Sequence, residues 1–224
     1  MFANDERVLK FPLYEKIFHN INAVTWYILA ITGGLVYFKL VSKQTASMLM
    51  NVHIWTAIIF TLNFFFFIVL APDRFYLMLK NLFAWDKDFW GWFKNLGGYP
   101  RMFGIPFGPE KTAPQGKYNA GQQIAYIIFI FMIFALIVTG WALYFFRQGL
   151  GKELVREMFY FHVWGGILTT LLVTFVHLPL SLINFEDFKA MWRIGNGSMP
   201  FEVAKHHSPK WVDNDLVEIE NYPR

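Results

Sequence analysis

The sequence predicts an all-α membrane protein built as a bundle of four transmembrane helices. Three observations support this fold class. Hydrophobic residues make up 55% of the 224 positions and aromatic residues 20%, which is more apolar than an ordinary soluble domain. Four separate apolar stretches are long enough to cross a bilayer, which takes about 20 residues. None of the four stretches contains Asp or Glu, whereas the segments between them are polar.

The four expected spans cover residues 17–38, about 48–71, about 122–146 and 159–184. The first apolar run is too long for a signal peptide, and no convincing small-residue cleavage site follows it. We therefore predict one membrane domain, 17–184, between an N-terminal segment, 1–16, and a C-terminal tail, 185–224. The connection 73–118 is basic and rich in aromatic residues, so we expect it at the membrane surface, with an interfacial helix or turn near 89–96.

The distribution of lysine and arginine predicts the orientation. The N-terminal segment, the 73–118 connection and the C-terminal tail contain all but five of the 20 lysines and arginines. Cytoplasmic segments of membrane proteins carry an excess of these residues, so both termini are expected in the cytoplasm. The net charge of +4 is modest and is explained by this bias, which leaves no reason to expect nucleic-acid binding.

Four histidines lie within or at the start of the expected spans: His19, His53, His162 and His177. An ionisable residue inside a membrane span is costly and points to a functional site. In the predicted orientation, His19 and His177 lie near the cytoplasmic side, and His53 and His162 lie near the outer side. The histidines thus form two candidate pairs at two depths, whereas His206 and His207 lie in the polar tail and are expected at the surface.

Two imidazoles per site suit the axial positions of a six-coordinate haem iron used for electron transfer. Cysteine is absent, which excludes covalent haem attachment through C-x-x-C-H and a thiolate-bound iron–sulfur cluster. A haem-free membrane anchor with hydrogen-bonded histidines remains an alternative. A transporter or a di-metal enzyme would usually need carboxylates within the spans, and these spans have none.

Four features of the sequence match a known family. They are His19 followed by Gly33, the motif Gly116-Lys117-Tyr118-Asn119-Ala120-Gly121-Gln122 before the third span, the His162/His177 helix, and the tail Lys205-His206-His207-Ser208-Pro209-Lys210-Trp211. In these features the chain resembles the cytochrome b (gamma) subunit of membrane-bound, quinone-reducing formate dehydrogenases. The resemblance covers nearly the whole chain except residues 73–115.

This resemblance implies a multi-pass protein of the bacterial inner membrane with two b-type haems. His53 and His162 would bind the outer haem iron, and His19 and His177 the cytoplasmic-side haem iron. It further implies a menaquinone or ubiquinone site near the cytoplasmic haem, lined by Asn119, Gly121 and His177. The implied partners are an iron–sulfur subunit that delivers electrons and a molybdenum- or tungsten-pterin subunit that oxidises formate, a reaction this chain would not catalyse by itself.

Two features leave alternatives open. The spacing from His162 to His177 is one residue longer than in the family, and a local bulge in the helix could absorb the additional residue. The stretch Thr139-Gly140-Trp141-Ala142-Leu143-Tyr144 also resembles cytochromes b of nickel–iron hydrogenases, so another respiratory oxidoreductase is a possible electron source. Without the family resemblance, Asn119 would be interpreted as the N-cap of a helix.

Overall fold

The computed structural model describes residues 6–192, 196–214 and 219–220. The chain divides into two compact units, whose boundaries fall near the ends of the expected spans and inside one of them. Unit 1 contains residues 1–16, 71–128 and 185–224, and unit 2 contains residues 17–70 and 129–184. Each unit is described by itself below.

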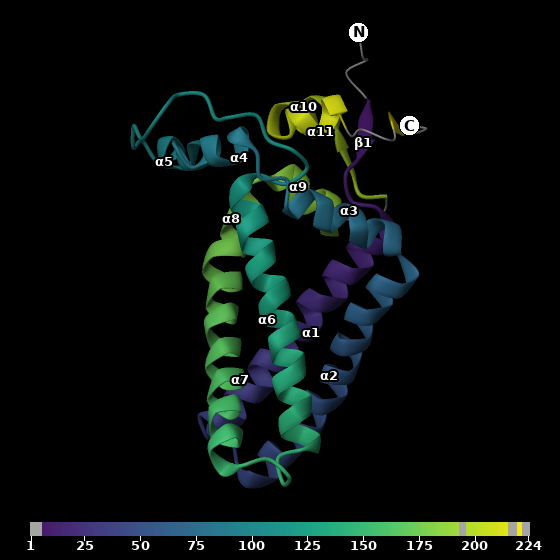
Figure 1. Ribbon diagram of the computed structural model, residues 1–224, viewed down its shortest axis with the longest axis vertical. Coiled ribbons are helices and arrows are strands. Elements are labelled where there is room, and N and C mark those ends of the chain that lie inside the picture. Colours follow the sequence, from purple (N-terminus) through teal and green to yellow (C-terminus); the bar gives the residue numbers. More distant parts are fainter. Residues whose placement is uncertain (1–5, 193–195, 215–218, 221–224) are drawn as a thin grey trace. The chain divides into compact units, whose positions relative to one another are not determined.

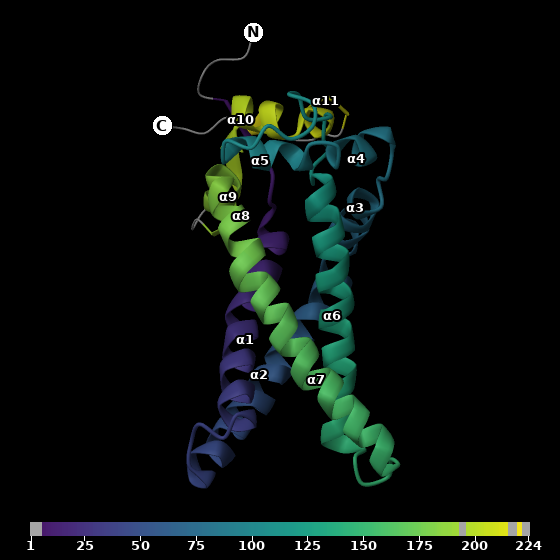
Figure 2. The same ribbon diagram turned by 90° about the vertical axis from the view of Figure 1, so that its left-hand side faces the viewer.

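Unit 2 is formed from long apolar helices. Helix α1 (Leu13–Tyr37) is joined by a short link to α2 (Lys43–Leu70), and α6 (Ala120–Phe145) is joined by another to α7 (Lys152–Leu172). Each pair is antiparallel (Figures 1 and 2). Among the described residues, three helical segments are long and apolar enough to cross a membrane: Lys43–Leu70, Ala120–Phe145 and Lys152–Ile183. Helix α1 contains the other expected span, and its Asn20 and Asn22 make it less apolar.

The last of these segments contains a bulge. Helix α7 is followed by a π-helical segment, Val173–His177, and then by α8 (Leu178–Ile183). A π turn holds one more residue than an α turn. The bulge lies between His162 and His177, where the sequence allowed for one, and it ends at His177.

Polar side chains link the helices of unit 2. The Trp26 indole donates a hydrogen bond to Thr170 Oγ1 at 3.1 Å, which joins α1 to α7. The Trp141 indole donates to Thr61 Oγ1 at 3.0 Å, which joins α6 to α2. The Asn63 side-chain amide donates to the Phe18 carbonyl at 3.0 Å, which joins α2 to α1. Such bonds hold membrane helices in a fixed register, because apolar contact alone does not distinguish a neighbouring helix from lipid.

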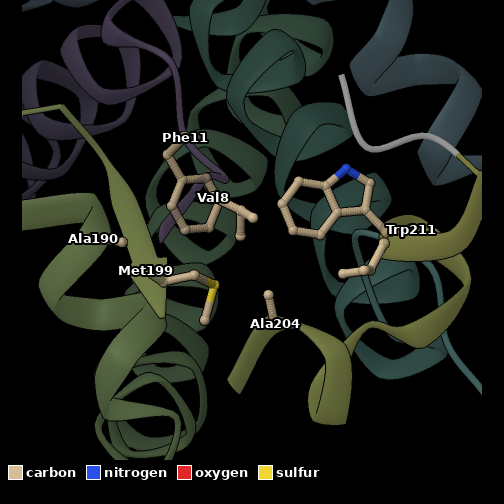
Figure 3. Close-up of a cluster of buried hydrophobic side chains, with 7 residues drawn as sticks. Val8, Phe11, Ala190, Met199, Ala204 and Trp211 are labelled. Carbon is tan, nitrogen blue, oxygen red and sulfur yellow. The ribbon is translucent and has the colours of Figure 1, made fainter. Parts of the chain in front are cut away.

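Unit 1 combines the two ends of the chain with the long connection. Strand β1 (Arg7–Leu9) lies between β2 (Ser198–Pro200) and β3 (Ile219–Glu220), and both pairings are antiparallel. A buried cluster covers this small sheet: Val8, Phe11, Ala190, Met199, Ala204, Trp211 and Val212. Figure 3 draws this cluster, whose side chains converge from β1, the residues just after it, α9 (Phe185–Trp192), β2, α10 (Phe201–His207) and α11 (Pro209–Asn214). The ends, which the sequence suggested were simply polar, therefore share a hydrophobic core.

The long connection also contains more helix than the sequence suggested. Pro72 ends α2 as expected, but it also opens α3 (Pro72–Leu82), because proline fits the first turn of a helix, where its missing N–H is not needed. Helix α4 (Lys87–Trp92) begins at an Asp86 cap, whose carboxylate accepts from the Asp88 and Phe89 amides at 2.9 and 3.0 Å. A 3₁₀ turn (Leu96–Gly98) and α5 (Tyr99–Met102) follow. The helix or turn expected near 89–96 is thus formed by α4, which begins and ends a few residues earlier.

Candidate functional site: two histidine pairs

The four span histidines all belong to unit 2, where they lie together in two pairs. The ring centroids of His53 and His162 are 6.5 Å apart, and those of His19 and His177 are 6.4 Å apart. Each pair joins residues from different parts of the chain: α2 with α7 in the first pair, and α1 with the π-helical segment in the second. The structure thus brings together the same partners that depth in the membrane suggested.

These separations fit two imidazoles on opposite sides of one metal ion. An imidazole nitrogen binds a metal at about 2.0–2.1 Å, and the centre of the ring lies about 1.1 Å behind that nitrogen. Two rings facing each other across one iron therefore have centroids about 6.3 Å apart. Among the described residues, no group of three or more His, Cys, Asp or Glu could hold a metal ion. Two imidazoles at such a separation match the pair of protein ligands that a bis-histidine haem iron uses.

Hydrogen bonds determine the tautomer of the first pair. His53 Nδ1 lies 3.0 Å from Thr32 Oγ1, and His162 Nδ1 lies 3.0 Å from Thr139 Oγ1. Each threonine hydroxyl already donates its proton to the carbonyl four residues earlier, Ile28 or Ala135, at 2.7 and 2.8 Å. With its proton donated in this way, the hydroxyl oxygen offers a lone pair to Nδ1–H, which favours the tautomer whose Nε2 is unprotonated and able to bind a metal.

Glycines allow both rings to approach the neighbouring helix. A Cβ atom at Gly33 would lie 3.2 Å from Cε1 of His53, and one at Gly140 would lie 2.9 Å from Cε1 of His162. A side chain at either glycine would displace the neighbouring imidazole, and the effect would be larger at Gly140. The same Thr-Gly pair therefore occurs at both contacts, as Thr32-Gly33 in α1 and Thr139-Gly140 in α6.

The second pair has different surroundings. His19 Nδ1 lies 3.1 Å from Asn20 Oδ1, a distance suited to a hydrogen bond that the imidazole N–H donates to the amide oxygen. The Phe129 and His177 rings meet nearly at right angles, with centroids 5.7 Å apart and ring planes at 84°. His206 and His207, in contrast, are exposed on α10, as the sequence suggested.

The residues expected to bind quinone are split between the units. Asn119 and Gly121 belong to unit 1, and His177 belongs to unit 2. Asn119 Oδ1 accepts a hydrogen bond from the backbone N–H of Gln122 at 2.9 Å. In return, Gln122 Oε1 accepts one from the backbone N–H of Asn119 at 3.0 Å. This reciprocal pair is a capping box at the start of α6, so Asn119 has a structural role that sequence reasoning had weighed as its alternative.

The ring that approaches the backbone at Gly121 is the indole of Trp92, which belongs to the same unit. A Cβ atom there would lie 2.6 Å from Cη2 of Trp92, on α4. The absence of a side chain at Gly121 is therefore explained by packing within unit 1. Four residues before Gly121, Lys117 forms an ion pair with Glu15 at 2.8 Å, and both side chains are about nine-tenths buried. Burial lowers the pKa of Lys117, while the charge of Glu15 acts in the opposite direction.

Comparison with known proteins gives one family match and three similar relatives. The family of prokaryotic cytochrome b561 matches residues 10–193. The sequence is also 32% identical over 105 residues to the cytochrome b556(Fdn) subunit of nitrate-inducible formate dehydrogenase from Escherichia coli K12, and equally to those of Escherichia coli O157:H7 and Shigella flexneri.

The aligned stretch covers 46% of this chain and 46% of each of these relatives, so the chain matches less than half of their length. The family match is much broader, because it includes all four paired histidines and most of both units. On that match, the chain belongs to the prokaryotic cytochrome b561 family of integral inner-membrane proteins.

Proposed function

We propose that this chain is a dihaem cytochrome b subunit that passes electrons from a partner iron–sulfur subunit to membrane quinone. The observation that carries the proposal is the presence of two histidine pairs with centroids 6.4 and 6.5 Å apart. Membership of a cytochrome b561 family implies b-type haem, and two pairs of this geometry would hold two. A bound haem supplies a one-electron iron couple, and two axial imidazoles leave no open position at which oxygen could bind.

The roles of the protein's own residues follow from their contacts. His53 and His162 would hold the outer haem, with Thr32 and Thr139 keeping each Nε2 free for iron. His19 and His177 would hold the cytoplasmic-side haem. The four expected spans, which contain all four histidines, lack Asp and Glu, so no carboxylate within them competes with the imidazoles for the metal.

We further propose that α1 crosses the membrane together with the other three helical segments, which makes a four-span bundle with both termini in the cytoplasm. The three segments that carry most of the lysine and arginine are parts of unit 1, which supports placing that unit on the cytoplasmic side. Quinone would be reduced on this side, near Asn119, Gly121 and His177, where the cytoplasm supplies protons.

The partner is proposed from the relatives. The curated relatives are cytochrome subunits of a formate dehydrogenase, which supports formate as the source of electrons, with an iron–sulfur subunit and a molybdenum- or tungsten-pterin subunit completing the complex. A nickel–iron hydrogenase is the second candidate, on the basis of the stretch 139–144. Addition of formate or of hydrogen to membranes that contain the native complex distinguishes the two, because only the true donor reduces the haems.

The central test is the haem content of the purified chain. We expect a reduced-minus-oxidised visible spectrum typical of b-type cytochromes and two haems per chain. A chain without haem would be a membrane anchor and would contradict the proposal. A chain with a single haem would contradict the assignment of the two histidine pairs.

A further inference from the structure

We propose that the hydroxyl groups of Thr32 and Thr139 are positioning groups that determine the orientation and the basicity of the two imidazoles at the outer haem. The inference rests on the proposed function, since it concerns the haem held by His53 and His162. It goes beyond that function because it assigns the reduction potential of one particular haem to two side chains that do not touch iron.

The first step of the argument is the direction of the hydrogen bonds. A hydroxyl has one proton, and Thr32 and Thr139 each donate it to their own helix, to Ile28 and to Ala135. What each hydroxyl offers to the histidine is a lone pair, 3.0 Å from Nδ1. An acceptor at Nδ1–H makes the other nitrogen a stronger electron donor, as it does in other metal sites where a histidine is hydrogen-bonded behind the metal.

The second step is the equivalence of the two contacts. In each case a threonine on one helix accepts from a histidine on the next, and the following glycine leaves room for the ring. The Thr-Gly sequence occurs at these two places and nowhere else in the 224 residues. Both axial positions of the same iron are thus supported in the same way, although the helices involved are far apart in sequence.

The third step is that the threonine is not the only acceptor nearby. The Leu29 carbonyl lies 3.2 Å from Thr32 Oγ1, and the Leu136 carbonyl lies 3.4 Å from Thr139 Oγ1, so an acceptor from the backbone lies beside each threonine. These carbonyls would remain if the hydroxyl were removed. We therefore expect loss of the hydroxyl to weaken the support of the ring rather than abolish it, so that the haem is retained and its properties change.

The test compares Thr139→Val, which keeps the shape and removes the hydroxyl, with Thr139→Ser, which keeps the hydroxyl. Redox titration of the visible spectrum gives the potential of each haem. With a weaker donor at iron, the ferric form is less stabilised, so the outer haem of the valine variant should become easier to reduce. We expect a change of up to about tenfold in its ferrous-to-ferric ratio at a fixed potential, which equals about 59 mV for one electron. The serine variant should stay close to the wild type.

Two internal controls accompany this comparison. The haem at His19 and His177 should keep its potential in every variant. Thr169→Val removes a threonine hydroxyl of α7 that makes the same bond to its own helix, at 2.8 Å to the Gly165 carbonyl, and should leave both haems unchanged. Thr32→Val should shift the potential in the same direction as Thr139→Val, and the double variant should shift it further than either.

The outcomes are distinct. A shift confined to the outer haem, or loss of that haem in the valine variant with retention in the serine variant, supports the proposal. An unchanged outer potential in both valine variants, or equal shifts with valine and serine, overturns it. A wild-type chain that binds no haem would instead overturn the proposed function.

Discussion

Gly140 lies so close to His162 that a Cβ atom at the glycine would be 2.9 Å from the imidazole Cε1 atom. The contact joins α6 to α7 at the histidine that the proposed function assigns to the outer haem. Since real Cβ atoms essentially never come this close to another heavy atom, any side chain at Gly140 must displace the ring or separate the helices.

Gly140→Ala should therefore remove the outer haem or make its binding unstable, and lower the haem content from two per chain towards one. Gly33→Ala, where the corresponding distance is 3.2 Å, should have a smaller effect on the same haem. The control is Gly166→Ala, because a Cβ atom there meets nothing within 4 Å. Full haem content with an unchanged spectrum in Gly140→Ala would show that the contact is not needed.

His53→Ala should remove the outer haem and leave the other haem in place, because His19 and His177 form a separate pair. The measurement is the ratio of haem to protein, together with the visible spectrum after reduction. His206→Ala changes an exposed histidine of α10 and should retain both haems. Loss of both haems in His53→Ala, in a protein that still folds, would argue against independent sites.

Asn119→Ala should have two effects, because Asn119 is the N-cap of α6 and also a proposed quinone ligand. Loss of the cap costs about 0.5–2 kcal/mol of stability, and loss of a partner for the quinone oxygen should slow reoxidation of the reduced haems by quinone. Both haems should remain. Asn119→Ser separates the effects, since serine caps helices as well as asparagine does but has no side-chain amide.

We expect Asn119→Ser to be as stable as the wild type and still slow with quinone. Gln122→Ala, which breaks the other half of the capping box, should lower stability and leave the quinone reaction unchanged. If the serine variant reacts with quinone at the wild-type rate, Asn119 acts only as a cap.

Lys117→Met should destabilise unit 1, because it leaves the buried carboxylate of Glu15 without its partner. Removal of one member of a buried ion pair typically costs about 3–5 kcal/mol. Lys94→Met is the matched control, since Lys94 is exposed. Thermal denaturation in detergent should show a clearly lower Tm for Lys117→Met, and addition of Glu15→Leu to that variant should recover much of the loss. A Tm equal to that of Lys94→Met would contradict this account of the pair.

The orientation can be tested with one introduced thiol, because the chain has no cysteine of its own. Lys94→Cys places the thiol at an exposed position of unit 1. An impermeant reagent should fail to label it in intact cells and should label it in inverted vesicles. Labelling of intact cells would reverse the topology and exchange the two haem positions between the sides of the membrane.

Three of the long apolar helical segments and the histidine pairs could be predicted from the sequence, because both depend on position along the chain and on depth in a membrane. An apolar run of sufficient length forms a helix that crosses the bilayer, since the backbone can hydrogen-bond only to itself there. Once each helix has a direction, the depth of each histidine follows from its distance to the end of the run. The pairs His53/His162 and His19/His177 follow from depth alone.

The depth of a residue in the membrane does not predict the rotation of its helix about the axis. Nor does it predict contacts between residues that are far apart in sequence. Three features depend on such contacts: the hydrogen bond between Thr139 and His162, the approach of Trp92 to Gly121, and the sheet that pairs Val8 with Met199. Helix α3 was missed for a related reason, because a proline that ends one helix can begin the next. Hydropathy indicates which segments lie away from water. Which residues contact one another there is determined only by the packing of the helices.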